Sequence, residues 1–195
     1  MLTNDQGKTL LNIARKNIIS YLDNGGMLNF SSDENIDLIN KNIWLNEKGA
    51  VFVTLNLSGN LKGCIGSLVA YRSLIEDVLE HSCNAAFKDT RFSPVTKNDM
   101  KNIEIEISVL SEKKDLKYTD FKDLKSKIEP FTDGVYLTYG PYSSTFLPQV
   151  WDQLPDFDQF MNHLCNKAGL SLDIFSDTNK LPTIEIYNVQ KFEEQ

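Results

Sequence analysis

The chain has 195 residues, of which 41% are hydrophobic and 24% charged, a composition typical of a globular protein with a substantial core. Its formal net charge of −7 repels polyanions, so we do not expect nucleic-acid binding. No apolar stretch is long enough to span a bilayer, and the N-terminus lacks the basic and apolar segments of a signal peptide. We therefore expect a cytoplasmic protein without a membrane partner.

The cysteines also bear on the compartment. Cys64, Cys83 and Cys165 form neither a C-x-x-C pair nor an even disulfide framework, which indicates reduced thiols in a reducing compartment. The same spacing argues against structural zinc and against a cysteine-bound iron–sulfur cluster. We expect no metal and no cofactor.

The N-terminal half of the chain contains the pattern of a helix followed by that of a hairpin. Apolar residues recur at helical spacing between Leu10 and Leu22, and two glycines then end the predicted helix. From Phe30 to Leu45 the pattern is weak. Alternation over residues 51–57 predicts a strand, and a turn at residues 58–60 leads into a returning strand over residues 61–68.

The remaining elements alternate between helical and strand patterns. Ser73 and Glu76 form a capping box for a helix that ends at Phe87. Further helices are predicted over residues 120–127 and 156–168, and strands over residues 103–109, 135–139, 145–147 and 183–189. Because this order has no regular βαβ spacing, it favours an α+β fold with mainly antiparallel sheets flanked by helices.

The segment Leu61-Lys62-Gly63-Cys64-Ile65-Gly66 places a thiol between two glycines, within the returning strand or at a break in it. Since glycine has no Cβ, Gly63 and Gly66 allow a ligand or a second backbone to approach Cys64. This arrangement suits a cysteine nucleophile, an anion site or nucleotide binding. It equally suits a tight bend with a small packed side chain.

A carboxylate and a guanidinium, Asp89 and Arg91, follow the predicted helix that ends at Phe87. Arginine is scarce in this lysine-rich chain, and its planar fork can bind a carboxylate or a phosphate with two hydrogen bonds. The alternative is an internal Asp89–Arg91 bridge that fixes a loop.

A third polar segment comes late in the chain and includes Gln149 and Trp151. The amide of Gln149 is a candidate for ligand recognition, whereas Trp151 is expected to pack in the core. Two histidines, His81 and His163, are the available bases for a cysteine nucleophile. We expect Cys83 and Cys165, which lie among apolar helical residues, to be buried.

Three segments, residues 61–66, 84–96 and 144–151, follow one another in the order and at the spacing of the AMMECR-type domain family. From about Ala50 to Tyr187 the chain resembles the bacterial branch, the A component of the AmmeMemoRadiSam set. The resemblance implies that residues 1–195 form one AMMECR-type domain. It also implies two intertwined subdomains, whose boundary is not visible in the sequence, with a groove between them.

The chain departs from the family pattern at four positions. Lys62 stands where the family usually has arginine, and Thr90 stands where proline is common. Ser144 replaces a glycine, and Phe175 stands where a tryptophan often occurs. Lys62 keeps a positive charge, but a lysine cannot make the bidentate contact of an arginine.

The family has no assigned reaction, so the resemblance implies partners rather than chemistry. It implies that the protein works with a Memo-like protein and a radical SAM enzyme, as a component that binds a small molecule or a peptide. The alternative is an enzyme that uses Cys64 as nucleophile for acyl transfer or hydrolysis. In either case the candidate ligand-binding residues are Lys62, Gly63, Gly66, Asp89, Arg91 and Gln149.

Overall fold

A computed structural model describes residues 1–28 and 39–194 of the chain. The chain folds into two compact units, of which unit 1 comprises residues 1–110 and 190–195, and unit 2 comprises residues 111–189. Unit 1 is therefore built from both ends of the chain, and unit 2 is inserted between two of its strands. This interlocked α+β architecture agrees with the predicted fold class.

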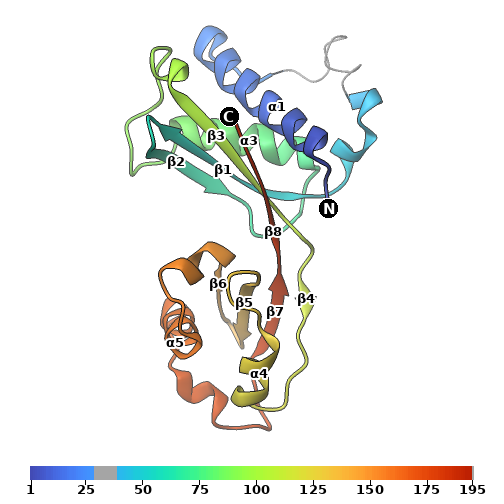
Figure 1. The fold of residues 1–195 in the computed structure, drawn as a ribbon, viewed down its shortest axis with the longest axis vertical. Coiled ribbons are helices and arrows are strands. Elements are labelled where there is room, and N and C mark those ends of the chain that lie inside the picture. Colours follow the sequence, from blue (N-terminus) through green and yellow to red (C-terminus); the bar gives the residue numbers. More distant parts are fainter. Residues whose placement is uncertain (29–38, 195) are drawn as a thin grey trace. The chain divides into compact units, whose positions relative to one another are not determined.

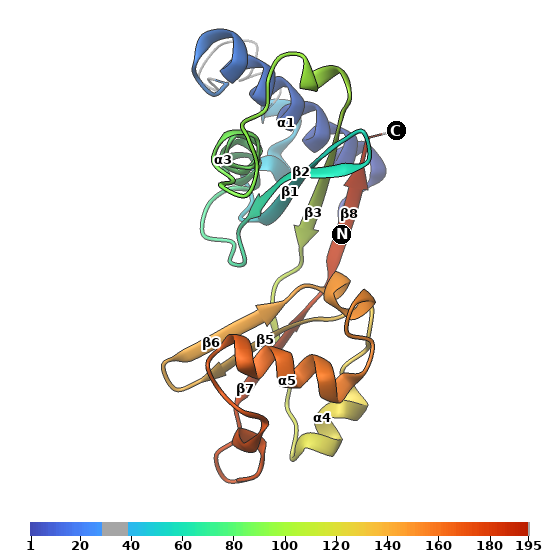
Figure 2. The same cartoon turned by 90° about the vertical axis from the view of Figure 1, so that its left-hand side faces the viewer.

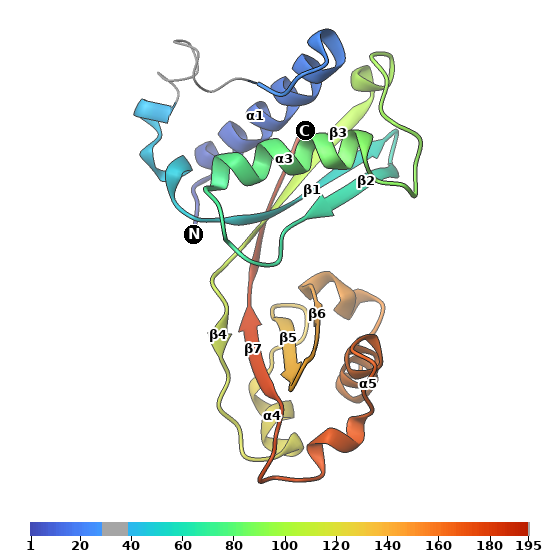
Figure 3. The ribbon, with the colours of Figure 1, turned by 180° about the vertical axis from the view of Figure 1, so that it is seen from behind.

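Unit 1 is a four-stranded sheet with helices on one face (Figures 1 and 3). Its elements are α1 (Asn4–Asn24), β1 (Ala50–Leu57), β2 (Asn60–Gly66), α3 (Leu74–Phe87), β3 (Ile103–Leu110) and β8 (Val189–Glu193). Two short 3-10 helices cover Ile43–Asn46 and Asp99–Lys101. The strand order is β2-β1-β3-β8, so β2 and β8 form the two edges of the sheet (Figure 2). Strand β1 pairs antiparallel with both β2 and β3.

The core of unit 1 follows from the alternation that the sequence shows. Val53 of β1 and Ile107 of β3 pair in the same register and are fully buried, as are Leu10 and Ile18 of α1. The intervening residues of each strand point to the other face of the sheet. Helix α1 is capped at its N-terminus by Thr3, which forms a capping box with Gln6, and at its C-terminus by Gly25, whose φ of 72° suits glycine.

Unit 2 contains a second antiparallel sheet, with the strand order β4-β7-β5-β6. Its elements are β4 (Lys114–Asp115), α4 (Phe121–Lys127), β5 (Gly134–Tyr139), β6 (Tyr142–Phe146), α5 (Phe157–Lys167) and β7 (Thr183–Tyr187), with 3-10 helices at Pro148–Asp152 and Leu172–Phe175. The Trp151 ring is buried and stacks on Phe160 of α5, with ring centroids 3.5 Å apart. The predicted core position of Trp151 is confirmed.

Most predicted elements are present, but the last strand differs. The structure divides residues 183–189 at Asn188, so that β7 belongs to the sheet of unit 2 and β8 continues into the sheet of unit 1. Alternating side chains specify a strand but not the sheet that it joins, which is why the sequence predicted a single strand. Of the weakly patterned segment Phe30–Leu45, residues 29–38 lie outside the described residues.

Candidate functional site

Cys64 lies in the middle of β2, at an edge of the unit 1 sheet, and its side chain is half-buried. Its partner on β1 is Thr54, whose hydroxyl donates to Cys64 Sγ at 3.3 Å. The side chain of Cys64 therefore lies on the face of the sheet opposite to the core residues Val53 and Leu55. The cysteine is thus part of a regular strand, in one of the two positions that the sequence allowed.

A β-bulge precedes the cysteine and determines the position of Lys62. Leu55 of β1 pairs with Gly63, whereas Asn56 pairs with Leu61, so Lys62 has no counterpart on β1. Such an extra residue re-aims the side chains near it. Lys62 Nζ donates to the hydroxyl of Ser93 at 2.8 Å, and the bulge thereby connects β2 to the loop after α3.

The two glycines of the motif have a packing function. A Cβ added to Gly63 would lie 2.1 Å from the Ala85 carbonyl oxygen of α3, and one added to Gly66 would lie 2.3 Å from the Val51 carbonyl oxygen. Neither glycine has a positive φ. The alternative of a tight bend is therefore wrong, because both residues belong to β2 and the irregularity lies at Lys62. A ligand contact at either glycine stays a prediction.

Asp89 and Arg91 form the internal bridge that was one of the two alternatives. Arg91 Nε donates to Asp89 Oδ1 at 2.9 Å and Arg91 Nη2 donates to Asp89 Oδ2 at 2.6 Å. Both residues also bind the main chain of Cys64. Its N–H donates to Asp89 Oδ2 at 2.9 Å, and its carbonyl oxygen accepts from Arg91 Nη2 at 3.1 Å.

These bonds close the edge of β2 at Cys64. The main-chain groups of an edge strand that point away from the sheet have no strand partner, and they invite pairing with another chain. At Cys64 the carboxylate of Asp89 satisfies the N–H and the guanidinium of Arg91 satisfies the carbonyl. Asp89 is almost completely buried, whereas 57% of the Arg91 side chain is exposed.

The charge of this bridge is stable to acid. The hydrogen bonds from the Arg91 side chain, helped by the N–H groups of Cys64 and Arg91, hold the pKa of Asp89 well below its usual range, although burial acts in the opposite direction. The same pairing raises the pKa of Arg91. Asp89 and Arg91 therefore remain ionised at physiological pH, and the edge of β2 stays closed.

Within the described residues of unit 1, the predicted base His81 does not pair with the thiol of Cys64. His81 Nε2 lies 2.7 Å from Ser67 Oγ and 3.3 Å from Asp77 Oδ1, on the buried side of α3. His163 is exposed on α5 in unit 2. Among the described residues, the hydrogen bond to Cys64 Sγ comes from Thr54.

A buried polar network surrounds Asp77, and no sequence pattern predicted it. Its carboxylate is fully buried and accepts from the N–H of Val51 and the hydroxyl of Ser67, each at 2.8 Å, and it pairs with Arg72 Nε at 3.1 Å. Asp77 stands among the apolar positions of α3 in the sequence, and this is the signal from which the network could have been predicted. Because Ser67 and Asp77 both face His81 Nε2, this network lacks the relay of a Ser-His-Asp triad.

Gln149 lies in a short 3-10 helix of unit 2 and is exposed, and its side chain makes no hydrogen bond to the described residues. Cys64, Lys62, Asp89 and Arg91 belong to unit 1. The structure thus brings these four residues together around one strand. The participation of Gln149, and the groove between the subdomains, stay predictions.

The other two cysteines are buried, as predicted. Burial raises the pKa of Cys83 and of Cys165 to about 11, so both thiols remain protonated at neutral pH.

Among residues 1–28 and 39–194, no group of three or more His, Cys, Asp or Glu side chains is arranged to hold a metal ion. None of the helices in the described part of the chain combines the length and the apolar content that crossing a bilayer requires.

Comparisons with known proteins cover nearly the whole chain. The sequence model of the AMMECR1 family matches residues 11–192, which extends the resemblance to α1 and β8. A protein of Methanothermobacter thermautotrophicus is 34% identical over 97% of this chain and 93% of its own length. Protein MK0488 of Methanopyrus kandleri is 35% identical over 100% of this chain and 91% of its own length.

A solved structure shares the fold. The crystal structure of the uncharacterized protein PH0010 from Pyrococcus horikoshii superimposes with a TM-score of 0.81 and 30% identity, covering 100% of this chain and 94% of that one. These relatives come from archaea, and a specific place in the bacterial branch stays a prediction.

Proposed function

This chain belongs to the AMMECR1 family, and we propose that it acts as a binding component whose contact surface is the Cys64 edge of β2. In this proposal the protein works in the cytoplasm with a Memo-like protein and a radical SAM enzyme, and it contributes recognition rather than covalent chemistry. The observation that carries the proposal is the half-buried thiol, whose hydrogen bond comes from a hydroxyl and not from a base.

The closed edge supports binding because it makes the surface rigid. Asp89 and Arg91 fix the main chain of Cys64, and α3 packs directly against Gly63. A surface that is already ordered loses little conformational entropy when a ligand or a protein binds. The charge of Arg91 is paired with Asp89, but its guanidinium is exposed and can donate further hydrogen bonds to an acidic group of a partner.

The alternative function is a cysteine-dependent enzyme that carries out acyl transfer or hydrolysis. One observation favours it, because the Arg91 guanidinium binds the carbonyl oxygen of Cys64 at 3.1 Å and a neighbouring cation can stabilise a thiolate. In this case Cys64 would attack the substrate carbonyl. Lys62 or main-chain amides would then stabilise the developing negative charge.

Copurification with tagged Memo-like and radical SAM proteins tests the binding proposal. We expect the wild-type chain to be retained and Cys64→Ala to be retained several-fold less, because the thiol lies at the centre of the contact. Lys122→Ala, which changes an exposed residue of α4 in unit 2, is the matched control and is expected to bind normally. Retention of neither partner by the wild-type chain would contradict the proposal.

Alkylation of the thiols distinguishes the two functions. Cys83 and Cys165 serve as internal controls, because burial keeps them protonated and inaccessible. For a binding component, we expect Cys64 to react with iodoacetamide no faster than a small free thiol does at the same pH. Labelling that is much faster than that of the free thiol would favour the enzyme.

A further inference from the structure

We propose that the outer edge of β8 pairs with the same edge of a second copy of this chain, so that two unit 1 sheets join into one continuous antiparallel sheet. The contact is centred on Phe192, and Lys191 of each copy faces Glu193 of the other. This interface is distinct from the Cys64 edge, which lies at the opposite side of the sheet.

The hydrogen bonds between β8 and β3 show which main-chain groups of β8 remain available to another strand. Glu194 N–H donates to the Ile105 carbonyl oxygen at 3.0 Å, so the main chain of Glu194 points inward to β3. In an antiparallel sheet successive residues point alternately to the two sides. Phe192 therefore also points inward, whereas the N–H and carbonyl groups of Lys191 and Glu193 point outward. Within the described residues, β8 is the terminal strand of its sheet, and no hydrogen bond caps these groups.

The side chains of β8 divide in the same way. The Phe192 ring is buried against Gly7 of α1, where an added Cβ would lie 2.0 Å from the ring. The Gln190 amide binds both the N–H and the carbonyl of Leu2, at 2.8 and 2.7 Å. Glu194 pairs with Arg15. These residues anchor β8 to its own chain.

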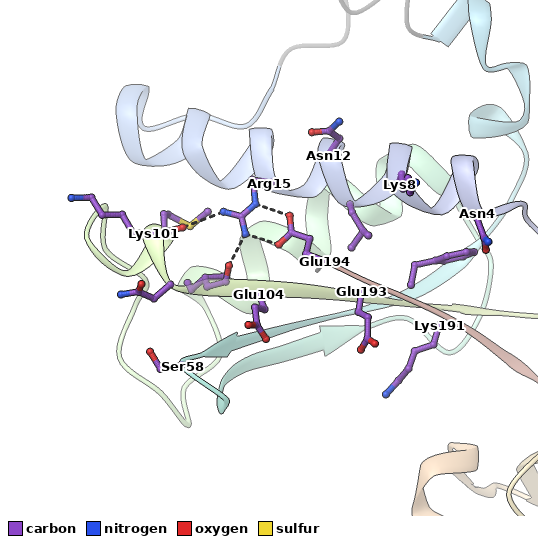
Figure 4. A pocket seen from close by; sticks show the side chains of 15 residues that line it. Asn4, Lys8, Asn12, Arg15, Ser58, Lys101, Glu104, Lys191, Glu193 and Glu194 are labelled. Atoms are coloured by element: carbon purple, nitrogen blue, oxygen red, sulfur yellow. Dashed lines mark hydrogen bonds and ion pairs between the residues drawn. The ribbon is translucent and has the colours of Figure 1, made fainter.

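The side chains of Lys191 and Glu193 take no part in this anchoring to α1 and the N-terminus. Both are exposed and point away from α1, whereas Glu194 points toward Arg15 (Figure 4). Lys191 Nζ also lies 2.9 Å from Glu106 on the neighbouring strand, and this contact holds the lysine on the same face of the sheet as Glu193. The strand thus presents one positive and one negative charge beside its unpaired main-chain groups.

The order of these charges selects a single self-pairing register. When two copies of β8 run antiparallel with Phe192 opposite Phe192, Lys191 of each copy faces Glu193 of the other. In this register Lys191 and Glu193 are the hydrogen-bonded pair, in which the two residues exchange both N–H···O bonds. A register centred on Lys191 or on Glu193 would place like charges directly opposite each other, which is unfavourable.

The surface beside β8 leaves room for a second strand. An open groove of about 1150 Å³ has α1 on one side and β3 and β8 on the other, and its lining includes Lys191, Phe192, Glu193 and Glu194 (Figure 4). All of its lining residues belong to unit 1. A second copy is the occupant that the charges favour, because β8 itself supplies the complementary sequence.

Charge reversal followed by sedimentation equilibrium of the full chain tests the proposal. We expect the wild type to dimerise between about 1 and 500 µM, the range of a modest interface. Lys191→Glu alone and Glu193→Lys alone should each weaken dimerisation by about tenfold or more, since both cross-strand ion pairs become repulsive. An equimolar mixture of the two variants should form a heterodimer, because each then supplies the charge that the other needs.

Two controls separate this effect from damage to the fold. Glu106→Gln removes the contact of Lys191 within its own chain and should leave dimerisation unchanged. The double variant Lys191→Glu with Glu193→Lys should dimerise like the wild type, because it restores both cross-strand ion pairs with their signs exchanged. A wild type that stays monomeric over the whole range would overturn the proposal. So would a dimer that neither single reversal weakens.

Discussion

The two edges of the unit 1 sheet are treated differently by the chain. At β2 the loop after α3 supplies Asp89 and Arg91, which satisfy both main-chain groups of Cys64. At β8 the outward groups of Lys191 and Glu193 have no such cap among the described residues, and the strand carries two opposite charges instead. One edge is thus closed by the chain itself, whereas the other is open to a strand that matches its charges.

In the β2 and β8 edges, the availability of the main-chain groups and the exposure of the side chains are separate properties. Cys64 lies on an edge strand and is half-buried, yet its main chain is occupied, so a partner can reach only its side chain. Lys191 offers both its main chain and its side chain. We therefore expect the β2 edge to bind through side-chain contacts and the β8 edge to bind by strand addition.

We expect the greatest loss of stability from a substitution that disturbs the packing of α3 against β2. Gly63→Ala would place a methyl group 2.1 Å from the Ala85 carbonyl oxygen, and a backbone atom cannot move aside as a side chain can. We expect the free energy of unfolding to fall by about 3 kcal/mol or more, as measured by chemical denaturation. Gly26→Ala is the control, since nothing lies within 4 Å of the added methyl and the change should be close to neutral.

Removing the carboxylate that closes β2 should have the next largest effect. Asp89→Asn leaves Arg91 and the Cys64 N–H without a charged acceptor, so we expect a loss of about 1–3 kcal/mol in the free energy of unfolding.

This loss should depend on pH. The pKa of Asp89 is lower in the folded than in the unfolded protein, so its contribution is complete above the unfolded value of about 4 and declines as the pH falls below it. Denaturation of the wild type and of Asp89→Asn should therefore converge at low pH. A difference that stays constant down to about pH 2 would contradict the assigned role of the charge.

A smaller effect is expected from Arg91→Lys. The lysine keeps the charge but cannot bind both oxygens of Asp89 and the Cys64 carbonyl at once. Because more than half of the Arg91 side chain is exposed, we expect a loss of only about 0.5–1 kcal/mol in the free energy of unfolding. A cost as large as that of Asp89→Asn would mean that the guanidinium, rather than the carboxylate, closes the edge.

Amide hydrogen exchange tests the difference between the β2 and β8 edges without any substitution. The Cys64 N–H should exchange slowly despite its edge position, because Asp89 accepts its hydrogen bond. The N–H groups of Lys191 and Glu193 should exchange fast in dilute protein and more slowly as the concentration rises and β8 pairs. Equal protection of the two edges in dilute solution would show that β8 is capped in a way that its hydrogen bonds do not reveal.

Much of the fold could be predicted because local patterns specify it. The capping box of Ser73 and Glu76, the alternation over residues 103–109 and the turn at residues 58–60 each identify an element through its own residues. The strand from 183 to 189 was predicted too simply. Its alternation says that it is extended, but its division between two sheets depends on partners that are distant in the chain.

The candidate site was predictable only in part. The motif around Cys64 and the pairing of Asp89 with Arg91 were both visible as short segments. That the pair binds the main chain of Cys64 was not visible, because the hydrogen bonds span 25 and 27 residues. The buried network of Asp77, Ser67 and His81 was missed for the same reason, since it depends on which face of α3 is covered.

Neighbouring residues and the order of short motifs are enough to specify the elements, their caps and the family. Tertiary contacts are needed to establish that Gly63 packs against a helix, that Asp89 closes one sheet edge, and that β8 forms the other edge. A strand lies at an edge when no other strand pairs with one of its sides. The alternation of side chains along a strand does not depend on such pairing, so it cannot identify an edge.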